Sequence, residues 1–400
     1  MTESSPRTEP TESLLDRVCE LIAAHADAAR IADAKRRHAD VLAGRRTDYL
    51  PMIFPVATPP EAADWPDFDW HERFHDPGKS LFMQLKDTVL PRICGDSDYV
   101  PGVRADLGTI NCMTVFGAEW RVTGENRSVI TKYVPKDVLA EFELPDDISA
   151  MGEIPRVVEH MTHHVEALRS RGLGEVVSVY HCDQQGTFDI AAMTRGHEIF
   201  TDMYEDPPLV HRLMGLCTEV YVAVTKLCKR ISGEAVGGAG NGVGVWMDAG
   251  AVRMCGDSDI LVGERCFREF IQPYHRRAFD ALGGGWFHYC GGWEGTGRSE
   301  GVHLHEAYAE IEGIHGLNWT TAGDWLAEMK KLHRLGVAHV GTLPRPRDES
   351  LEDYYRRALS PYDDRRGLLF GGMWQSPWFF DAERPRAMEL WHRTQDEVFG

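Results

Sequence analysis

The sequence lacks long apolar runs and an excess of basic charge. No stretch of about 18 consecutive apolar residues occurs, which is the length that a membrane-spanning helix needs. The chain has 43 Lys and Arg against 62 Asp and Glu, for a formal net charge of −19. A surface with this balance repels phosphate backbones and anionic lipid, so neither nucleic acid nor membrane is expected as a partner.

A disulfide framework and a secretion signal are also not evident. The nine cysteines are odd in number and irregularly spaced over 400 residues, so reduced thiols and a cytoplasmic location are expected. The N-terminal segment has no basic-then-apolar order. It is polar and contains Pro6 and Pro10, so residues 1–13 are predicted to be a disordered tail before one domain, 14–400.

The sequence does contain a regular alternation of strand-like and helix-like segments. Apolar residues make up 43%, enough for a large core. Short apolar runs separated by helical periodicity are typical of parallel βαβ units. Five or more consecutive units favour a closed barrel, although an open doubly wound sheet shows the same alternation. We predict a single (β/α)8 TIM barrel. Its strands are expected near 50–56, 176–180, 242–249, 251–255, 285–290, 313–319, 337–343 and 367–371.

The first part of the chain is less regular. Residues 12–44 are predicted to form helices in front of the barrel. Residues 57–80 combine aromatic residues with prolines and acids and are interpreted as a long capping loop. Residues 100–135 are interpreted as a small insertion, with a β-rich stretch at 109–116 and a hairpin across 120–133.

The most specific chemical pattern is a histidine and a cysteine at the end of a predicted strand. Residues two apart on a strand face the same side, so His288 and Cys290 are expected to point together. Zinc accepts an imidazole and a thiolate as ligands. The alternative is a buried histidine packed beside a buried cysteine.

Other polar residues also follow predicted strands, where the active site of a barrel lies. Asp257 could exchange a proton with a substrate or cap the next helix. Asp183 and Gln185 are further catalytic candidates, and the alternative is that Asp183 stabilises its own turn. Trp374 could cover an apolar ligand or pack on the last helix. The candidates for substrate binding are Tyr289, Asn318 and Trp374.

Several sequence blocks resemble those of the uroporphyrinogen decarboxylase superfamily. The resemblance spans about residues 36–372 and implies a (β/α)8 barrel. It is carried by residues 45–51 (RRTDYLP), 186–191 (GTFDIA), 196–198 (GHE), 202–207 (DMYEDP), 257–258 (DS), 267–274 (FREFIQPY) and 288–291 (HYCG).

The superfamily contains two chemistries, and the resemblance favours one of them. Its decarboxylases need no cofactor and hold substrate carboxylates with an arginine-bearing loop after the first strand; here residues 55–60 read PVATPP. Its corrinoid-linked methyltransferases bind zinc through the His and Cys of H-x-C-G and a later cysteine. This sequence matches His288 and Cys290 but has no cysteine after Cys290. Candidate third ligands are Asp257, Glu294, Cys255 and Cys182.

The resemblance therefore implies a zinc-dependent methyltransferase that acts on a small methylated compound, with a corrinoid protein as partner. Two alternatives stay open at this point. The first is cofactor-free decarboxylation of a small or porphyrin-like acid, in which Asp257 would stabilise a protonated intermediate. The second is a barrel that binds a small molecule without catalysis. A homodimer is a further expectation that the sequence leaves open.

Overall fold

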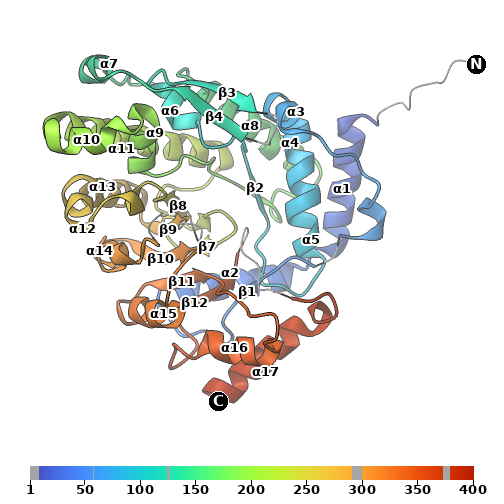
Figure 1. Ribbon diagram of the computed structural model, residues 1–400. Helices are drawn as coiled ribbons and strands as arrows, with labels where there is room; N and C mark the ends of the chain where they lie inside the picture. The colour runs from blue at the N-terminus through green and yellow to red at the C-terminus, as the bar shows by residue number, and fades with distance from the viewer. Residues whose placement is uncertain (1–8, 57, 124–126, 291–299, 373–378) are drawn as a thin grey trace, which may run out of the picture.

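The structure is a computed structural model that describes residues 9–56, 58–123, 127–290, 300–372 and 379–400 (Figure 1). Most of its strands gather in the middle of the molecule, and most of its helices lie around them (Figure 1). Among the described helices, none combines the length and the apolarity that a membrane crossing requires.

The largest sheet in the described chain has six strands, and every paired neighbour is parallel. The predicted parallel βαβ units are thereby confirmed for this part of the chain. All twenty-five strand residues are buried except His315, which is partly exposed, because helices cover the sheet. The strands, in sheet order, are β1 (Met52–Ile53), β12 (Leu368–Gly371), β11 (Ala338–Gly341), β10 (Ile314–Trp319), β9 (Gly285–Tyr289) and β8 (Val252–Cys255).

A separate parallel pair joins β2 (Gly102–Arg104) to β5 (Ser178–Tyr180). The segment after β5 approaches β8 closely. The amide of Arg253 in β8 donates to His181 Nε2 at 3.2 Å, and a Cβ added at Gly186 would collide with the carbonyl oxygen of Cys255. Only glycine allows the two segments to approach this closely.

Two helices precede the first strand, as predicted for residues 12–44. They are α1 (Thr11–His25) and α2 (Ala28–Leu42). Asp27 begins α2 by accepting the amide protons of Ala29 and Arg30 at 2.9 and 3.1 Å. Helix α1 starts at Thr11, inside the segment that was interpreted as a tail, because its apolar face from Leu14 onward is buried.

The remaining helices lie mostly between consecutive strands, with α17 at the C-terminal end. Helices α12 and α13 are separated by a π-helical turn at Phe267–Ile271. The helices after α2 are α3 (Trp70–His75), α4 (Pro77–Gln84), α5 (Leu90–Ile93), α6 (Asn111–Val115), α7 (Lys136–Glu141), α8 (Ile154–Ser170), α9 (Thr187–Arg195), α10 (Glu198–Glu205), α11 (Pro207–Ser232), α12 (Glu264–Cys266), α13 (Gln272–Leu282), α14 (His305–Ala309), α15 (Trp325–Arg334), α16 (Leu351–Leu359) and α17 (Ala387–Phe399).

The interpretation of residues 57–80 as a long loop was wrong, because α3 and the first half of α4 lie there. Asp69 and Glu72 form a capping box: each side chain accepts the other residue's amide proton, at 2.8 and 3.1 Å. Asp76 then caps α4, whose first residue is Pro77. These local signals outweigh the prolines and acids that suggested a loop.

The interpretation of residues 100–135 was correct only in part. The hairpin is confirmed by the antiparallel strands β3 (Glu119–Thr123) and β4 (Arg127–Lys132), and its turn lies outside the described residues. The predicted β-rich stretch at 109–116 is wrong, because it contains helix α6. The segment is also not purely an insertion, since β2 pairs with β5.

The strand predicted at 242–249 was wrong as well. This region forms a tight hairpin between β6 (Gly240–Asn241) and β7 (Trp246–Met247). Val243 and Gly244 have φ values of 60° and 80°, which an extended strand excludes. The side chain of Asn241 accepts the amide proton of Gly244 at 2.6 Å and so stabilises the turn.

Candidate functional site

The end of β9 carries the histidine and the cysteine that the sequence singled out. His288 is buried and Cys290, directly after the strand, is exposed. His288 Nε2 lies 3.2 Å from Cys290 Sγ, so the two side chains do point together. Tyr289 points to the opposite face, where its hydroxyl contacts Nε2 of His305 at 2.7 Å. Substrate binding by Tyr289 stays a prediction.

A third potential ligand, Asp257, joins this pair from the turn after β8. The ligand atoms of Asp257, His288 and Cys290 all lie within 4.8 Å of one another. Asp257 Oδ1 accepts the amide proton of Cys290 at 2.6 Å. The site therefore combines a carboxylate, an imidazole and a thiol that come from neighbouring parallel strands.

The orientation of the His288 ring is fixed by a residue of the neighbouring strand β10. Its Nδ1 atom contacts Oδ1 of Asn318, the residue that pairs with it in β10. The amide nitrogen of Asn318 donates to the carbonyl oxygen of Val340 in β11, which determines which way the amide faces. An acceptor at Nδ1 keeps the proton there and leaves the lone pair of the ring on Nε2. The predicted role of Asn318 in substrate binding is untested.

The protonation states of the pair follow from burial. Burial, together with the nearby charge of Arg253, lowers the pKa of His288 to about 3, so the imidazole is neutral near pH 7. Although Cys290 is exposed on one side, partial burial of its thiol and the Asp257 carboxylate raise the pKa of Cys290 to about 12. The cysteine is therefore a thiol in the metal-free protein, and a bound cation would have to displace its proton.

Asp257 is held by a residue that sequence reasoning missed. Asp189, in the first turn of α9, accepts the amide proton of Asp257 at 3.2 Å and that of Ser258 at 2.6 Å. Asp189 is buried, and burial with the neighbouring Asp257 charge raises its pKa well above the usual value. The pKa of Asp257 is raised as well, chiefly by burial. The resembling block at 186–191 contains Asp189, and this was the available signal.

Asp183 sits between two arginines that were also missed, one buried (Arg253) and one largely buried (Arg104). Arg104, the last residue of β2, contacts it at 3.1 Å, and Arg253 in β8 contacts it at 3.4 Å. Despite its burial, these charges hold the pKa of Asp183 far below its usual range. Gln185, with φ of 67°, donates to Asp183 from its side chain at 2.8 Å. An arginine inside the apolar strand 251–255 was the signal for Arg253.

Two other candidate ligands, Cys255 and Cys182, do not join the group. Cys255 and Cys182 are buried, and burial helps to raise the pKa of both thiols well above the usual value. Cys182 Sγ instead lies 4.0 Å from Cys228 Sγ. Glu294 and Trp374, the two other predicted site residues, lie outside the described residues.

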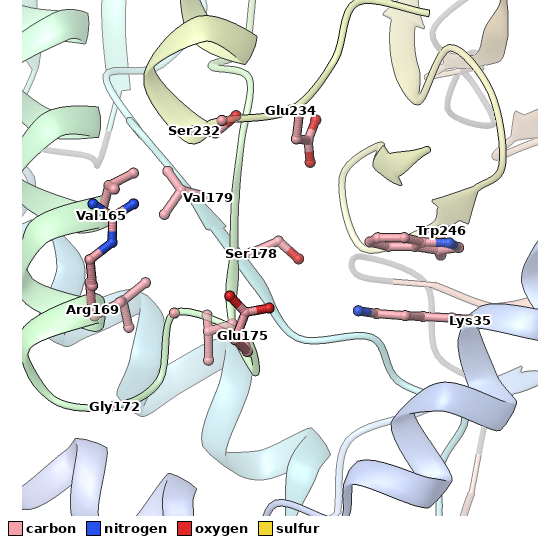
Figure 2. Close-up of a pocket in the computed structure, with 14 residues that line it drawn as sticks. Lys35, Val165, Arg169, Gly172, Glu175, Ser178, Val179, Ser232, Glu234 and Trp246 are labelled. Atoms are coloured by element: carbon pink, nitrogen blue, oxygen red, sulfur yellow. The ribbon is translucent and has the colours of Figure 1, made fainter. Parts of the chain in front are cut away.

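A cavity of about 430 Å³ lies at the opposite end of β5 (Figure 2). It opens beside Ser178, the first residue of that strand, whereas Asp183 follows the last. Lys35 lies 4.2 Å from the ring centroid of Trp246, and Glu234 faces the same space (Figure 2). The cavity contains none of the predicted site residues, so it is distinct from the group around His288.

Comparisons with known proteins identify a solved structure with the same fold. The sequence matches no protein-family profile, and no curated protein matches it. Among solved structures, a methyltransferase from Methanosarcina mazei superposes with a TM-score of 0.61. The superposition covers 91% of this chain and 98% of the other, with 17% sequence identity. The two chains share a fold.

Proposed function

We propose that this chain is a methyltransferase-like enzyme whose active site is a zinc centre on Asp257, His288 and Cys290. The observation that carries the proposal is the convergence of these three side chains within 4.8 Å at the ends of parallel strands. The fold shared with a methyltransferase supports it, and so do the sequence blocks that resemble the uroporphyrinogen decarboxylase superfamily. Membership of that superfamily is part of the proposal.

The fold proposed for this enzyme is a complete (β/α)8 barrel. The six-stranded sheet and the β2–β5 pair supply eight parallel strands within the described residues. The contacts of β8 with His181 and Gly186 support closure on one side. On the other side, Asp98, four residues before β2, accepts the amide proton of Met52 in β1 at 3.0 Å.

The three side chains fit zinc. In a tetrahedral zinc site, bonds of about 2.0–2.3 Å place neighbouring ligand atoms roughly 3.3–3.8 Å apart. The 3.2 Å between His288 Nε2 and Cys290 Sγ is close to this spacing. Three protein ligands leave a fourth position for a substrate, as catalytic zinc sites require. Zinc bound here would polarise the heteroatom of a substrate or hold a thiolate.

The side chains of this chain would have separate tasks. His288 stays neutral and offers Nε2, while Asn318 holds its ring. Asp257 cannot be both a ligand and a proton donor, because a coordinated carboxylate has no proton to give. Its proximity to His288 and Cys290 favours the role of ligand. The proton that the leaving heteroatom gains then comes from water.

The proposed reaction removes a methyl group from a small methylated compound, with a corrinoid protein as the second substrate. The bond from the methyl carbon to the heteroatom breaks, and the heteroatom keeps the electron pair and gains a proton. The corrinoid supplies the electron pair of the new bond to carbon. The reverse transfer, from methylated corrinoid to a thiol, would use the same side chains.

Zinc analysis and a methyl-transfer assay test the proposal together. Protein purified without chelator is expected to contain about one zinc per chain, and Cys290→Ser is expected to lose it. Cys255→Ser, which changes a buried thiol on the neighbouring strand, is the matched control and should keep the metal. Methylcobalamin should be demethylated in the presence of a thiol acceptor. A metal-free wild-type protein without this activity would reject the proposal.

One observation favours a second candidate, the decarboxylation of a small acid. Arg253 lies near His288 and Cys290, and Arg104 shares Asp183 with it, so guanidinium groups are present that the loop at residues 55–60 lacks. Both are engaged by Asp183, which limits what they offer to a substrate. Release of carbon dioxide from uroporphyrinogen or a smaller acid by metal-free protein would select this candidate. Tight binding of a small molecule without either activity would leave a non-catalytic barrel.

A further inference from the structure

One buried carboxylate outside the proposed ligand set holds the turn that carries Asp257. Asp189 Oδ1 accepts the amide proton of Ser258 at 2.6 Å, and Oδ2 accepts that of Asp257 at 3.2 Å. The side chain is almost entirely buried, with 1% of its surface exposed. Both oxygens of one carboxylate therefore hold two successive amides of the turn after β8.

The same turn is tied to the end of β9. Asp257 Oδ1 accepts the amide proton of Cys290 at 2.6 Å, and the amide of Gly256 donates to the carbonyl oxygen of His288 at 2.8 Å. A continuous series of hydrogen bonds thus runs from Asp189 through the turn to the two residues on β9. The orientation of the Asp257 carboxylate is therefore fixed by Asp189 on one side and by the amide of Cys290 on the other.

The placement of Asp189 in its own helix makes these contacts unusual. An acidic residue in the first turn of a helix commonly interacts with the amides of that helix. Asp189 is the third residue of α9, yet within the described residues its hydrogen bonds reach the turn at 257–258 instead. Its side chain therefore supports the next βα loop rather than the start of α9.

We propose that Asp189 is the positioning residue of the metal site. By fixing the turn at 257–258, it keeps the Asp257 carboxylate facing His288 and Cys290 before any ion arrives. The proposal rests on the proposed zinc function, and it adds a residue that would touch neither the metal nor the substrate. Residues that orient metal ligands typically change metal affinity by about 10- to 100-fold when they are altered.

Asp189→Asn is the most informative variant. Asparagine has the same shape, but its amide nitrogen is a donor and cannot accept a proton from a backbone amide. One of the two bonds to the turn is lost whichever way the amide faces. Asp98→Asn is the matched control. Asp98 is equally buried and also accepts a backbone amide proton, that of Met52, but in contact with β1.

Two measurements on the full chain separate positioning from general stability. The first is the affinity for zinc alone, measured by competition with a chelator and by protection of Cys290 from alkylation. Cys290 is suited to this because it is exposed, while Cys94 is partly exposed and the other seven cysteines are buried. The second is amide hydrogen exchange of the metal-free protein, which measures how stably the amides of the turn are hydrogen-bonded when no metal is bound.

Asp189→Asn is expected to bind zinc about 10- to 100-fold more weakly. In the metal-free protein its amides at 256–258 and 290 should exchange faster, while those of β12 keep the wild-type rate. Asp98→Asn should match the wild type in zinc affinity and in exchange at 256–258, even if its melting temperature falls. If Asp189→Asn does not fold, Asp189→Ser, which removes the second acceptor oxygen, is expected to show the same changes.

The outcomes distinguish this inference from the proposed function. Wild-type zinc affinity and wild-type exchange in the Asp189 variants would overturn the inference, whatever the enzyme does. If wild-type protein binds no zinc but the variants loosen the turn, the positioning of Asp257 by Asp189 stands and the zinc function fails. If wild-type protein binds zinc and the variants loosen the turn without losing affinity, Asp189 is not a positioning residue of the metal site.

Discussion

His288 Nδ1 contacts the side-chain oxygen of Asn318 across the register of β9 and β10, and this contact turns Nε2 toward the thiol of Cys290, 3.2 Å away. A histidine that binds a metal usually has its second ring nitrogen held by an acceptor in this way. Asn318 thus holds the His288 ring in the orientation that the proposed metal site requires, while its own amide is held by the backbone of Val340.

Replacing Asn318 should therefore weaken metal binding without removing a ligand. Asn318→Leu, which offers no acceptor to Nδ1, is expected to lower zinc affinity by about 10- to 100-fold. Asn318→Asp keeps an oxygen beside Nδ1 and should bind zinc far more tightly than the leucine variant. Competition with a chromogenic chelator measures both. Equal affinities of the leucine variant and the wild type would mean that the contact does not orient the ring.

The cysteines should react in a defined order. Cys290 is exposed, Cys94 is partly exposed and the other seven cysteines are buried. At alkaline pH, where the raised pKa of Cys290 slows its reaction less, limited alkylation of the native, metal-free protein, followed by mass spectrometry, is expected to label Cys290 first because it is the most exposed, and zinc should slow this labelling. Cys290→Ser should abolish the first phase. Early labelling of Cys255 or Cys182 instead would contradict the burial described here.

Asp183 should contribute more to stability than its neighbour Asp106. It is the shared partner of the buried Arg253 and the largely buried Arg104, so Asp183→Asn leaves the positive charges of both arginines less well balanced. Breaking such a buried network is expected to cost about 3–5 kcal/mol of unfolding free energy. Asp106 is more exposed and, among the described residues, pairs with Arg104 alone, so Asp106→Asn should cost about 1 kcal/mol. Urea unfolding would measure the difference, and similar losses in both variants would contradict it.

The buried histidine His160 in α8 should make stability fall in mild acid. Burial, with the nearby charge of Arg156, lowers its pKa to about 4 from the usual 6.5. Between these two pKa values the unfolded chain binds a proton that the folded chain does not, so unfolding becomes easier as the pH falls. The contribution is at most about 1.4 kcal/mol per pH unit for one group.

Unfolding free energies at pH 7, 6 and 5 test this expectation. His160→Gln should show a shallower decrease with falling pH than the wild type. The exposed His25, changed to Gln, is the control and should leave the slope unchanged. A slope that is equally steep in the His160 variant would mean that other groups account for the acid sensitivity.

Strands and site residues at the C-terminal side of the chain were predictable because the signals there are local. Each apolar run from 251 to 371 became a strand of the main sheet. The two-residue period of a strand was enough to place His288 and Cys290 on one side. Asp257 was also a reasonable choice, since the residues after β8 and β9 meet at the same edge of a parallel sheet.

The contacts between segments distant in sequence could not be predicted from local sequence patterns. Nothing local at Asp189 indicates that its carboxylate reaches the amides of the turn at 257–258, nearly seventy residues later. Arg104 and Asp183 meet only because β2 pairs with β5, and the segment that holds β2 was interpreted as an insertion. The helices α3 and α4 were missed for a different reason: composition was given more weight than the capping signals.

The support that Asp189 gives to the following loop has a consequence for protein engineering. A protein built on parallel strands and helices is often treated as a series of exchangeable segments, each consisting of a strand, its loop and its helix. Here helix α9 belongs to one segment and the turn it holds belongs to the next. A chimaera that joins a foreign segment between residues 196 and 256 would keep both partners only if their spacing were reproduced. Grafting the pair as one unit is therefore the sound way to transfer this site to another scaffold.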